Sequence, residues 1–473
     1  MSPALAAVLA VACATNPATG AKQLILVSES QEMSLGRDYD QDVVASIGLY
    51  PDSGAQRYIQ QFGTRLAATS ERPHLPWTFR VVDDPVVNAF ALPGGYIYVT
   101  RGILAHLNSE AELAGVVGHE IGHVTARHSV SQMSKQQLAQ IGLAVGTMAS
   151  PDFERYAGIA SAGLGVLFLK YSRDAERQAD DLGLRYMRRV NFDPREMPHV
   201  FEMLTRVSQT QGGGRVPEWL ATHPDPENRR GRIEREIAAL PQNFSGAAVN
   251  RDSYLQRLDG LVFGNNPREG YFTGSQFFHP ELRFRLTFPE GWTTNNGKQA
   301  VAAVSPQQDA VVELSLAKEP TADAAARMFL SQRGVTGGYP ARTTVGGLPA
   351  VGAAFTAATE SGTLRGTVLC VEYGGAVYRL VGYATEARWP AYQGVAEGAL
   401  RSFARLTDPA ALTVQPQRVD IVRLDRPTTI AELARRRPSP ASAATLALIN
   451  QVDPETPLEA GRVVKWVVGQ PLP

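Results

Sequence analysis

The sequence lacks several features that would narrow its class at once. It has only two cysteines, Cys13 and Cys370, so a disulfide framework is excluded. No apolar run reaches the roughly 20 residues that a membrane-spanning helix needs. Forty-six basic residues balance 46 acidic ones without any Lys/Arg-rich run, which argues against nucleic-acid binding. What remains is a folded protein of 473 residues, long enough for about three domains.

The two cysteines have different surroundings. Cys370 lies among strand-forming residues and is expected to be a buried small side chain. Cys13 ends the apolar run 5–12 and precedes a polar stretch, which resembles a lipobox, the bacterial signal for lipid attachment. No basic residue precedes the run, and Ala10 stands where Leu is usual, so we expect translation to start further upstream. A buried N-terminal helix is the alternative.

The most informative segment is the string His119-Glu120-Ile121-Gly122-His123. Residues four apart share one face of a helix, so His119 and His123 can direct both imidazoles at a single ion. Two neutral histidines with a carboxylate between them form the zincin arrangement, in which Glu120 takes a proton from metal-bound water. The string predicts one catalytic Zn²⁺ per chain.

A second segment supplies candidates for the remaining protein ligand, because catalytic zinc needs three. Glu176 and Asp180 lie one helical turn apart and can face the histidines from another helix. We assign Glu176 as the third ligand and Asp180 as the acceptor that orients a ligating histidine. The alternative is a solvated charged helix face that includes Arg173 and Arg177.

Elements around the motif can also be predicted. Ser109 and Glu112 form a capping box, which predicts a helix that runs well beyond His128 and leaves His128 off the metal face as a structural residue. Strands are expected before it at 78–82, 86–92 and 96–99. The apolar stretches 138–148 and 157–169 are too short to cross a bilayer and are predicted to be packed helices.

These motifs together resemble the gluzincin zinc metallopeptidases (family M-forty-eight) that include the CAAX prenyl protease, HtpX and BepA. The resemblance covers about the first 250 residues and rests on a few short strings: 119–123, Glu176-x-x-x-Asp180, 88–95, Arg127-His128 and 222–224. It implies that Asn88, Ala89 and Phe90 pair with extended substrate. It also implies that His223 and Arg229 stabilise the oxyanion of the transition state, and that His223 can instead sit on the zinc and hold the enzyme inactive.

The rest of the chain predicts further modules. We expect a multidomain protein: a mainly α zincin-type peptidase domain with a small β-sheet, then an α+β domain resembling the PsbP/Mog1 type, then a small βααβ module resembling a degenerate LysM. The expected boundaries are 1–22 for the signal and tether, 23–262 for the peptidase, 263–275 for a linker, 276–408 for the α+β domain and 409–473 for the last module.

An export signal and a metallopeptidase motif together predict an endopeptidase on the periplasmic side of the bacterial cell envelope, anchored to the outer membrane by lipid on Cys13. Its expected partners are unfolded or outer-membrane polypeptides, and no nucleic acid. The alternatives are an envelope-assembly chaperone or scaffold with occasional proteolysis, and a protein that docks on peptidoglycan through its last module.

Overall fold

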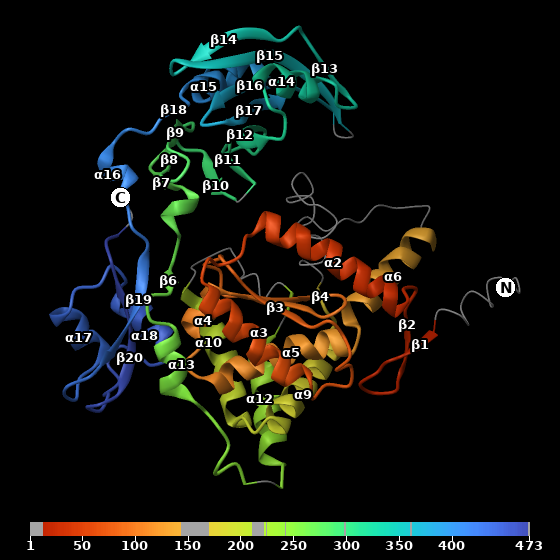
Figure 1. Cartoon of the computed structure of the whole chain (residues 1–473), viewed down its shortest axis with the longest axis vertical. Coiled ribbons are helices and arrows are strands. Elements are labelled where there is room, and N and C mark those ends of the chain that lie inside the picture. The colour runs from red at the N-terminus through yellow and green to blue at the C-terminus, as the bar shows by residue number, and fades with distance from the viewer. Residues whose placement is uncertain are drawn as a thin grey trace, which may run out of the picture. The chain divides into compact units, whose positions relative to one another are not determined.

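A computed structural model describes residues 13–142, 170–210, 222–223, 225–241, 243–297, 299–359 and 362–471. The chain divides into two compact units, one formed by the residues up to Gly264 with Gln417–Gly469, the other by Asn265–Pro416 (Figure 1). Most of the two apolar stretches predicted at 138–148 and 157–169 lies outside the described residues. Among the described helices, none combines the length and apolarity needed to cross a bilayer.

A three-stranded sheet forms the centre of the first unit, in the order β3-β5-β4. Its strands are β3 (Thr78–Val82), β4 (Ala89–Leu92) and β5 (Tyr96–Thr100), with β5 parallel to β3 and antiparallel to β4. Every residue of the middle strand β5 is buried. The strand β4 begins three residues later than predicted, because the Thr100 hydroxyl donates to the carbonyls of Val86 and Asn88 and holds that segment in a turn.

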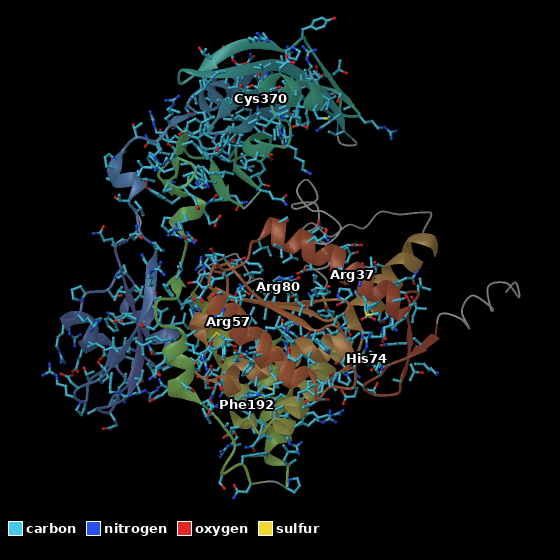
Figure 2. The ribbon with its side chains drawn as sticks, viewed as in Figure 1. Arg37, Arg57, His74, Arg80, Phe192 and Cys370 are labelled. Atoms are coloured by element: carbon cyan, nitrogen blue, oxygen red, sulfur yellow. The ribbon has the colours of Figure 1, made fainter. Side chains whose placement is uncertain are left out.

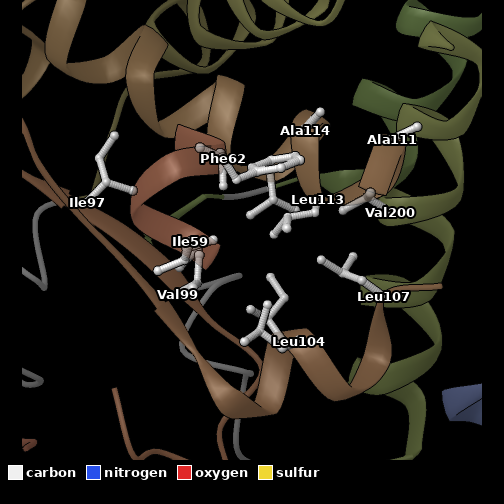
Figure 3. Close-up of a cluster of buried hydrophobic side chains, with 14 of the residues drawn as sticks. Ile59, Phe62, Ile97, Val99, Leu104, Leu107, Ala111, Leu113, Ala114 and Val200 are labelled. Atoms are coloured by element: carbon white, nitrogen blue, oxygen red, sulfur yellow. The ribbon is translucent and has the colours of Figure 1, made fainter. Parts of the chain in front are cut away.

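Helices surround this sheet and carry most of the unit (Figure 1). The described helices are α2 (Glu29–Ser46), α3 (Ser53–Ala67), α4 (Arg101–His106), α5 (Glu110–Thr125), α6 (His128–Gly142), α9 (Arg173–Arg189), α10 (Met197–Thr210), α12 (Pro226–Ala238) and α13 (Arg251–Arg257), with a 3-10 turn η2 (Pro194–Glu196). A hairpin of β1 (Cys13–Thr15) and β2 (Lys22–Leu24) precedes them. Apolar side chains of α3, α5 and β5 meet in one core, among them Ile59, Phe62, Val99 and Leu113 (Figure 3).

The helix that carries the His-Glu-x-x-His string begins as predicted, with Ser109 Oγ accepting from the Glu112 N–H. It ends sooner than predicted. The chain turns after Thr125, Arg127 takes a left-handed conformation with φ of 59°, and a separate helix, α6, starts at His128. Two contacts stabilise this turn: Arg127 donates through Nε to the Glu32 carboxylate and through Nη2 to a backbone carbonyl.

The C-terminal segment has the predicted order of strand, two helices and strand. It contains β19 (Gln417–Arg423), α17 (Ile430–Arg436), α18 (Ala443–Ile449) and β20 (Val463–Val468). β19 pairs with β20 on one side and with β6 (Val262–Phe263) on the other. The segment therefore belongs to the same compact unit as the metal-motif helix, whereas the sequence suggested a module of its own. Its LysM-like character stays a prediction.

The second unit is built on an eight-stranded antiparallel sheet against which helices α14 (Ala322–Leu330) and α15 (Trp389–Arg401) pack. Its elements are η3 (Pro267–Glu269), β7 (Tyr271–Thr273), β8 (Gln276–His279), β9 (Phe284–Thr287), β10 (Thr293–Asn296), β11 (Ala300–Val304), β12 (Ala310–Ala317), α14 (Ala322–Leu330), β13 (Val335–Gly337), β14 (Ala341–Val345), β15 (Leu348–Thr359), β16 (Gly362–Tyr373), β17 (Ala376–Thr385), α15 (Trp389–Arg401), β18 (Ala404–Arg405) and α16 (Pro409–Leu412). Strands β7, β8, β9 and β18 form a smaller second sheet. Cys370 is fully buried in this unit, as predicted (Figure 2).

Candidate metal centre

Small residues bring helices α5 and α9 together. A Cβ atom on Gly118 would lie 3.1 Å from the Gly183 Cα, and one on Gly122 would lie 2.9 Å from the Ala179 carbonyl oxygen. Such spacing leaves no room for larger side chains, so the two backbones are in direct contact. Because α9 carries Glu176, this close approach positions its carboxylate beside the histidines of α5.

Four buried side chains from three segments converge at this helix pair: His119, His123, Glu176 and His223. Their possible ligand atoms all lie within 4.8 Å of one another. The Nε2 atoms of His119 and His123 are 3.0 Å apart, and Glu176 carboxylate oxygens lie 3.7 Å and 3.4 Å from them. Ligand atoms about 2.1 Å from a tetrahedral zinc are about 3.4 Å from each other. The spacing and the imidazole and carboxylate donors fit a zinc ion.

Asp180 lies where the sequence analysis expected it, against the outer nitrogen of His119. Its Oδ1 is 2.9 Å from His119 Nδ1. Arg229 donates to both Asp180 oxygens, over 2.9 Å and 2.5 Å, and its Nη1 lies 2.7 Å from Glu176 Oε2. The guanidinium also lies over the Phe201 ring. Arg229 thus neutralises two buried carboxylates at this centre, while the sequence analysis predicted that it stabilises an oxyanion.

Charge determines the protonation of the acidic groups here. Burial would raise the pKa of Glu176, but the charges of His223 and Arg229 outweigh burial and hold the pKa well below its usual value. Burial would likewise lower the pKa of His223, but the Glu176 carboxylate, 3.0 Å from its Nδ1, raises it. Each of these two groups therefore favours the charged form of the other.

Glu120 occupies a different environment on the same helix. It is 1% exposed, and its Oε1 has no hydrogen-bond partner among the described residues. Burial raises its pKa to about 7. Beside it lies a small apolar pocket of about 10 Å³, room for one water molecule, lined by Val116, Met197, Val200 and Phe201. His223 Nε2 lies 3.8 Å from Glu120 Oε1. A carboxyl with a pKa near neutrality and no hydrogen bond on one oxygen is suited to accept and return a proton.

His128 contacts His123, which the sequence analysis did not predict. Because α5 ends at Thr125 and the chain turns back at Arg127, the His128 Nδ1 lies 3.0 Å from the Nδ1 of His123. Burial lowers the pKa of His128 to about 4, so the ring is neutral at pH 7. No sequence pattern marked the turn, since Arg is not a residue that favours the left-handed conformation.

Tyr171 is a second contact that sequence reasoning missed. Its ring stacks on His123 with centroids 4.0 Å apart, and its hydroxyl lies 2.8 Å from Ser129 Oγ. It lies just before α9, in a stretch that carries no metal-binding pattern, so only the folded chain shows its place at the site.

The predicted substrate-pairing residues lie on and beside β4. Ala89 and Phe90 belong to the strand, which is an edge of its sheet, and Asn88 immediately precedes it. β4 packs against α5. The Asn88 Oδ1 is buried and has no hydrogen-bond partner among the described residues. The backbone groups on the outer side of β4 make no strand pairing within the described part of the chain.

Several known proteins are similar in sequence to part of this chain. The beta-barrel assembly-enhancing protease of Escherichia coli (strain K12) is 32% identical over 270 residues, 54% of this chain and 53% of that protein. The protein of the same name from Yersinia pestis is 33% identical over 222 residues, 45% of each chain. Mitochondrial metalloendopeptidase OMA1 of Arabidopsis thaliana is 37% identical over 166 residues, 34% of this chain and 32% of that one.

These matches cover only part of each protein, and this chain spans at most about half the length of these curated relatives. Among solved structures, a PsbP from the cyanobacterium Synechocystis superposes with a TM-score of 0.24 and 13% identity, over 28% of this chain and 94% of that one. That score is too low to bear on the predicted PsbP/Mog1-like domain. Residues 53–237, which include the His-Glu-x-x-His helix and Glu176, match the model of Peptidase family M48. These matches identify the segment 53–237 as a member of Peptidase family M48, a family of metallopeptidases.

Proposed function

We propose that this protein is a zinc-dependent endopeptidase whose metal ligands are His119, His123 and Glu176. The observation that carries the proposal is the convergence of these three buried side chains from two helices, with spacings of 3.0–3.7 Å between their ligand atoms. Zinc, when bound, supplies a Lewis acid that polarises both the attacking water and the peptide carbonyl.

Glu120 is the proposed general base. Its Oε1, which has no hydrogen bond among the described residues, accepts a proton from the attacking water and returns it to the leaving amine. With a pKa of about 7 in the metal-free protein, the carboxyl is poised for both transfers. Asp180 keeps the proton of His119 on Nδ1, so that its Nε2 faces the ligand cluster.

His223 is the proposed regulator of access to the metal. Its Nδ1 lies 3.3 Å from His119 Nε2 and 3.0 Å from Glu176, so it occupies the side on which a fourth ligand would bind. Withdrawal of this ring opens that position for water and substrate, and its imidazole can then serve as a donor to the oxyanion. Arg229 supports the reaction through the two carboxylates that it neutralises.

Substrate is proposed to bind as an extended strand along β4. Its backbone groups pair with those of residues 88–90 at this edge of the sheet. The relatives named beta-barrel assembly-enhancing protease support envelope proteins, including unfolded outer-membrane proteins, as the substrate class. A site of action on the periplasmic side of the envelope is proposed from the predicted export signal.

An anchored form is the proposed state in the cell, with lipid on Cys13, the residue at which β1 begins. Lipidation adds a mass of several hundred daltons to the mature N-terminal peptide, which mass spectrometry detects directly. An unmodified peptide that contains Cys13 would rule out the anchor and leave the peptidase proposal intact.

The peptidase proposal is tested by cleavage of casein or a urea-unfolded outer-membrane protein. We expect cleavage by the purified chain, loss of cleavage in a chelator, recovery on addition of Zn²⁺, and no cleavage by Glu120→Gln. Cleavage that persists in Glu120→Gln would refute the mechanism.

A scaffold role is the second candidate, because Asn265–Pro416 forms a compact unit separate from the metal centre. Complementation of a strain that lacks the protein distinguishes this scaffold role from proteolysis. Normal envelope integrity with Glu120→Gln, but not after excision of 265–416, would favour scaffolding over proteolysis. Pelleting of the full chain with peptidoglycan would instead indicate cell-wall docking through the last segment.

A further inference from the structure

A series of hydrogen bonds connects the N-terminal hairpin with His123. The Nδ1 atoms of His123 and His128 are 3.0 Å apart, and the Nε2 of His128 lies 2.8 Å from Gln178 Oε1. Asn16, in the turn after β1, donates from Nδ2 to the same Gln178 oxygen over 3.0 Å. The series matters because His123 can bind a metal through Nε2 only when its proton is on Nδ1.

Asn16 determines which group donates and which accepts in each hydrogen bond of this series. Its Oδ1 accepts from the backbone N–H groups of Ala18, over 2.9 Å, and Thr19, over 3.3 Å. The amide oxygen is therefore committed to its own turn, and the Asn16 NH₂ group must face Gln178. Since an NH₂ group only donates, the Gln178 atom that meets it is the carbonyl oxygen.

From Gln178 the proton positions follow one by one. The oxygen of Gln178 accepts, so His128 carries its single proton on Nε2. The Nδ1 of His128 then has a free lone pair and accepts the proton on His123 Nδ1. The His123 Nε2 is left with a lone pair that points toward His119 Nε2 and the Glu176 carboxylate.

We propose that His128, oriented by Gln178, is a positioning residue that fixes His123 in the tautomer able to bind metal. This inference rests on the proposed function. The two ligating histidines then have different supports: Asp180, a carboxylate held by Arg229, orients His119, whereas a neutral imidazole orients His123. Loss of such a supporting partner typically lowers metal affinity 10- to 100-fold, in round numbers.

The first test compares two substitutions of His128 in the full chain. In His128→Asn the side-chain oxygen occupies nearly the position of the imidazole Nδ1 and can still accept from His123, whereas His128→Leu cannot. We expect zinc affinity, measured by competition with a chelator, to fall about 10- to 100-fold in His128→Leu and much less in His128→Asn. His106→Leu removes another buried histidine away from the metal and serves as the control, with unchanged affinity. Equal losses in both His128 variants would overturn the proposal.

The second test needs no metal and no substrate. In chelator-treated protein labelled with ¹⁵N-histidine, the nitrogen shifts of His123 report which ring nitrogen carries the proton. We expect the Nδ1–H form in the wild type and a mixture of tautomers in His128→Leu. An unchanged Nδ1–H form in His128→Leu would contradict the proposal even if the protein binds zinc and cleaves peptides.

Gln178 provides variants that leave all the histidines in place. It is partly exposed, so its substitution perturbs folding less than substitution of His128. Gln178→Glu keeps an oxygen acceptor and should keep wild-type zinc affinity, whereas Gln178→Leu should weaken binding and mix the His123 tautomers. Wild-type behaviour of Gln178→Leu in both measurements would show that the series does not orient His123. If the wild type bound no zinc, the proposed function would fail while the tautomer measurement still decided the role of His128.

Discussion

Glu120 and the two histidines share one helical turn, yet their surroundings assign them different tasks. The imidazoles have partners at both ring nitrogens, while Glu120 Oε1 is buried without a hydrogen bond among the described residues and lies 3.8 Å from His223 Nε2. The sequence string already suggested that the two histidines bind metal and that Glu120 acts as a base. This was possible because the spacing of residues along a helix is a local property of the sequence. The string could not identify His128, whose contact with His123 depends on a left-handed turn at Arg127.

Substitution of Glu120 should separate catalysis from metal binding. Glu120→Gln keeps the shape of the side chain but cannot take a proton, so we expect kcat to fall by roughly 10²- to 10⁴-fold with unchanged zinc affinity. Peptide hydrolysis and zinc competition on the same preparation measure both quantities. An equal loss of zinc binding would show that the carboxylate is a ligand and not a base.

His106 should make the protein sensitive to acid. Burial lowers its pKa from 6.5 to about 4, although the Gly102 carbonyl acts in the opposite direction. Between these pH values the unfolded state binds more protons, so the free energy of unfolding falls as the pH drops, by about 3 kcal/mol in all. Urea unfolding in the presence of a chelator measures this loss.

Two substitutions separate His106 from the other groups that titrate in this pH range. In His106→Asn the pH dependence of the unfolding free energy should become shallower by up to one proton. The exposed His74, labelled in Figure 2, gives His74→Asn as the control for loss of a histidine from an exposed position. An identical slope in wild type and His106→Asn would show that His106 does not titrate with unfolding.

At the scale of elements, helix positions were predictable and their packing was not. Capping at Ser109, the paired strands and the apolar periodicity are local, and they indicated most of the elements near the metal centre. The contact of α5 with α9 depends on pairs far apart in the sequence, Gly118 with Gly183 and Gly122 with Ala179. Nothing in the sequence marks Gly118 and Gly122 as contact positions. Only the position of α9 shows that a Cβ atom at either residue has no space.

A methyl group at Gly122 should push the two helices apart. Its Cβ would lie 2.9 Å from the Ala179 carbonyl oxygen, a backbone atom that cannot move away alone. We expect Gly122→Ala to cost about 1–3 kcal/mol in unfolding free energy and to weaken zinc binding, since α9 carries Glu176. Gly115→Ala is the matched control on the same helix, because its nearest neighbour is a flexible Met197 side chain at 3.4 Å. Similar zinc affinities in the two variants would contradict this account.

At the scale of the whole molecule, the C-terminal segment is part of the unit that holds the metal centre. The buried Lys465 of β20 donates to the carbonyls of Ala105 and Leu107, directly before α5. Gln451 donates to Glu112 on α5 itself. The sequence predicted the order of elements in this segment, but not these contacts, which join residues more than 330 positions apart.

This arrangement predicts which part of the chain can be removed. Phe263 pairs with Gln417 across β6 and β19, so the two ends of 265–416 lie on adjacent strands. Replacing 265–416 with a short Gly/Ser loop should leave a folded protein with wild-type zinc affinity, whereas truncation after Phe263 should not. Circular dichroism melting and zinc competition compare the two deletions. Loss of folding after the internal excision would contradict the division into units.

Zinc content tests the central claim most directly. After dialysis against a weak chelator, elemental analysis should find one zinc per wild-type chain and almost none in Glu176→Gln, which leaves both histidines in place. Glu176→Gln that retains a full equivalent of zinc, or a zinc-free wild-type protein that still cleaves peptides, would contradict the three-ligand site.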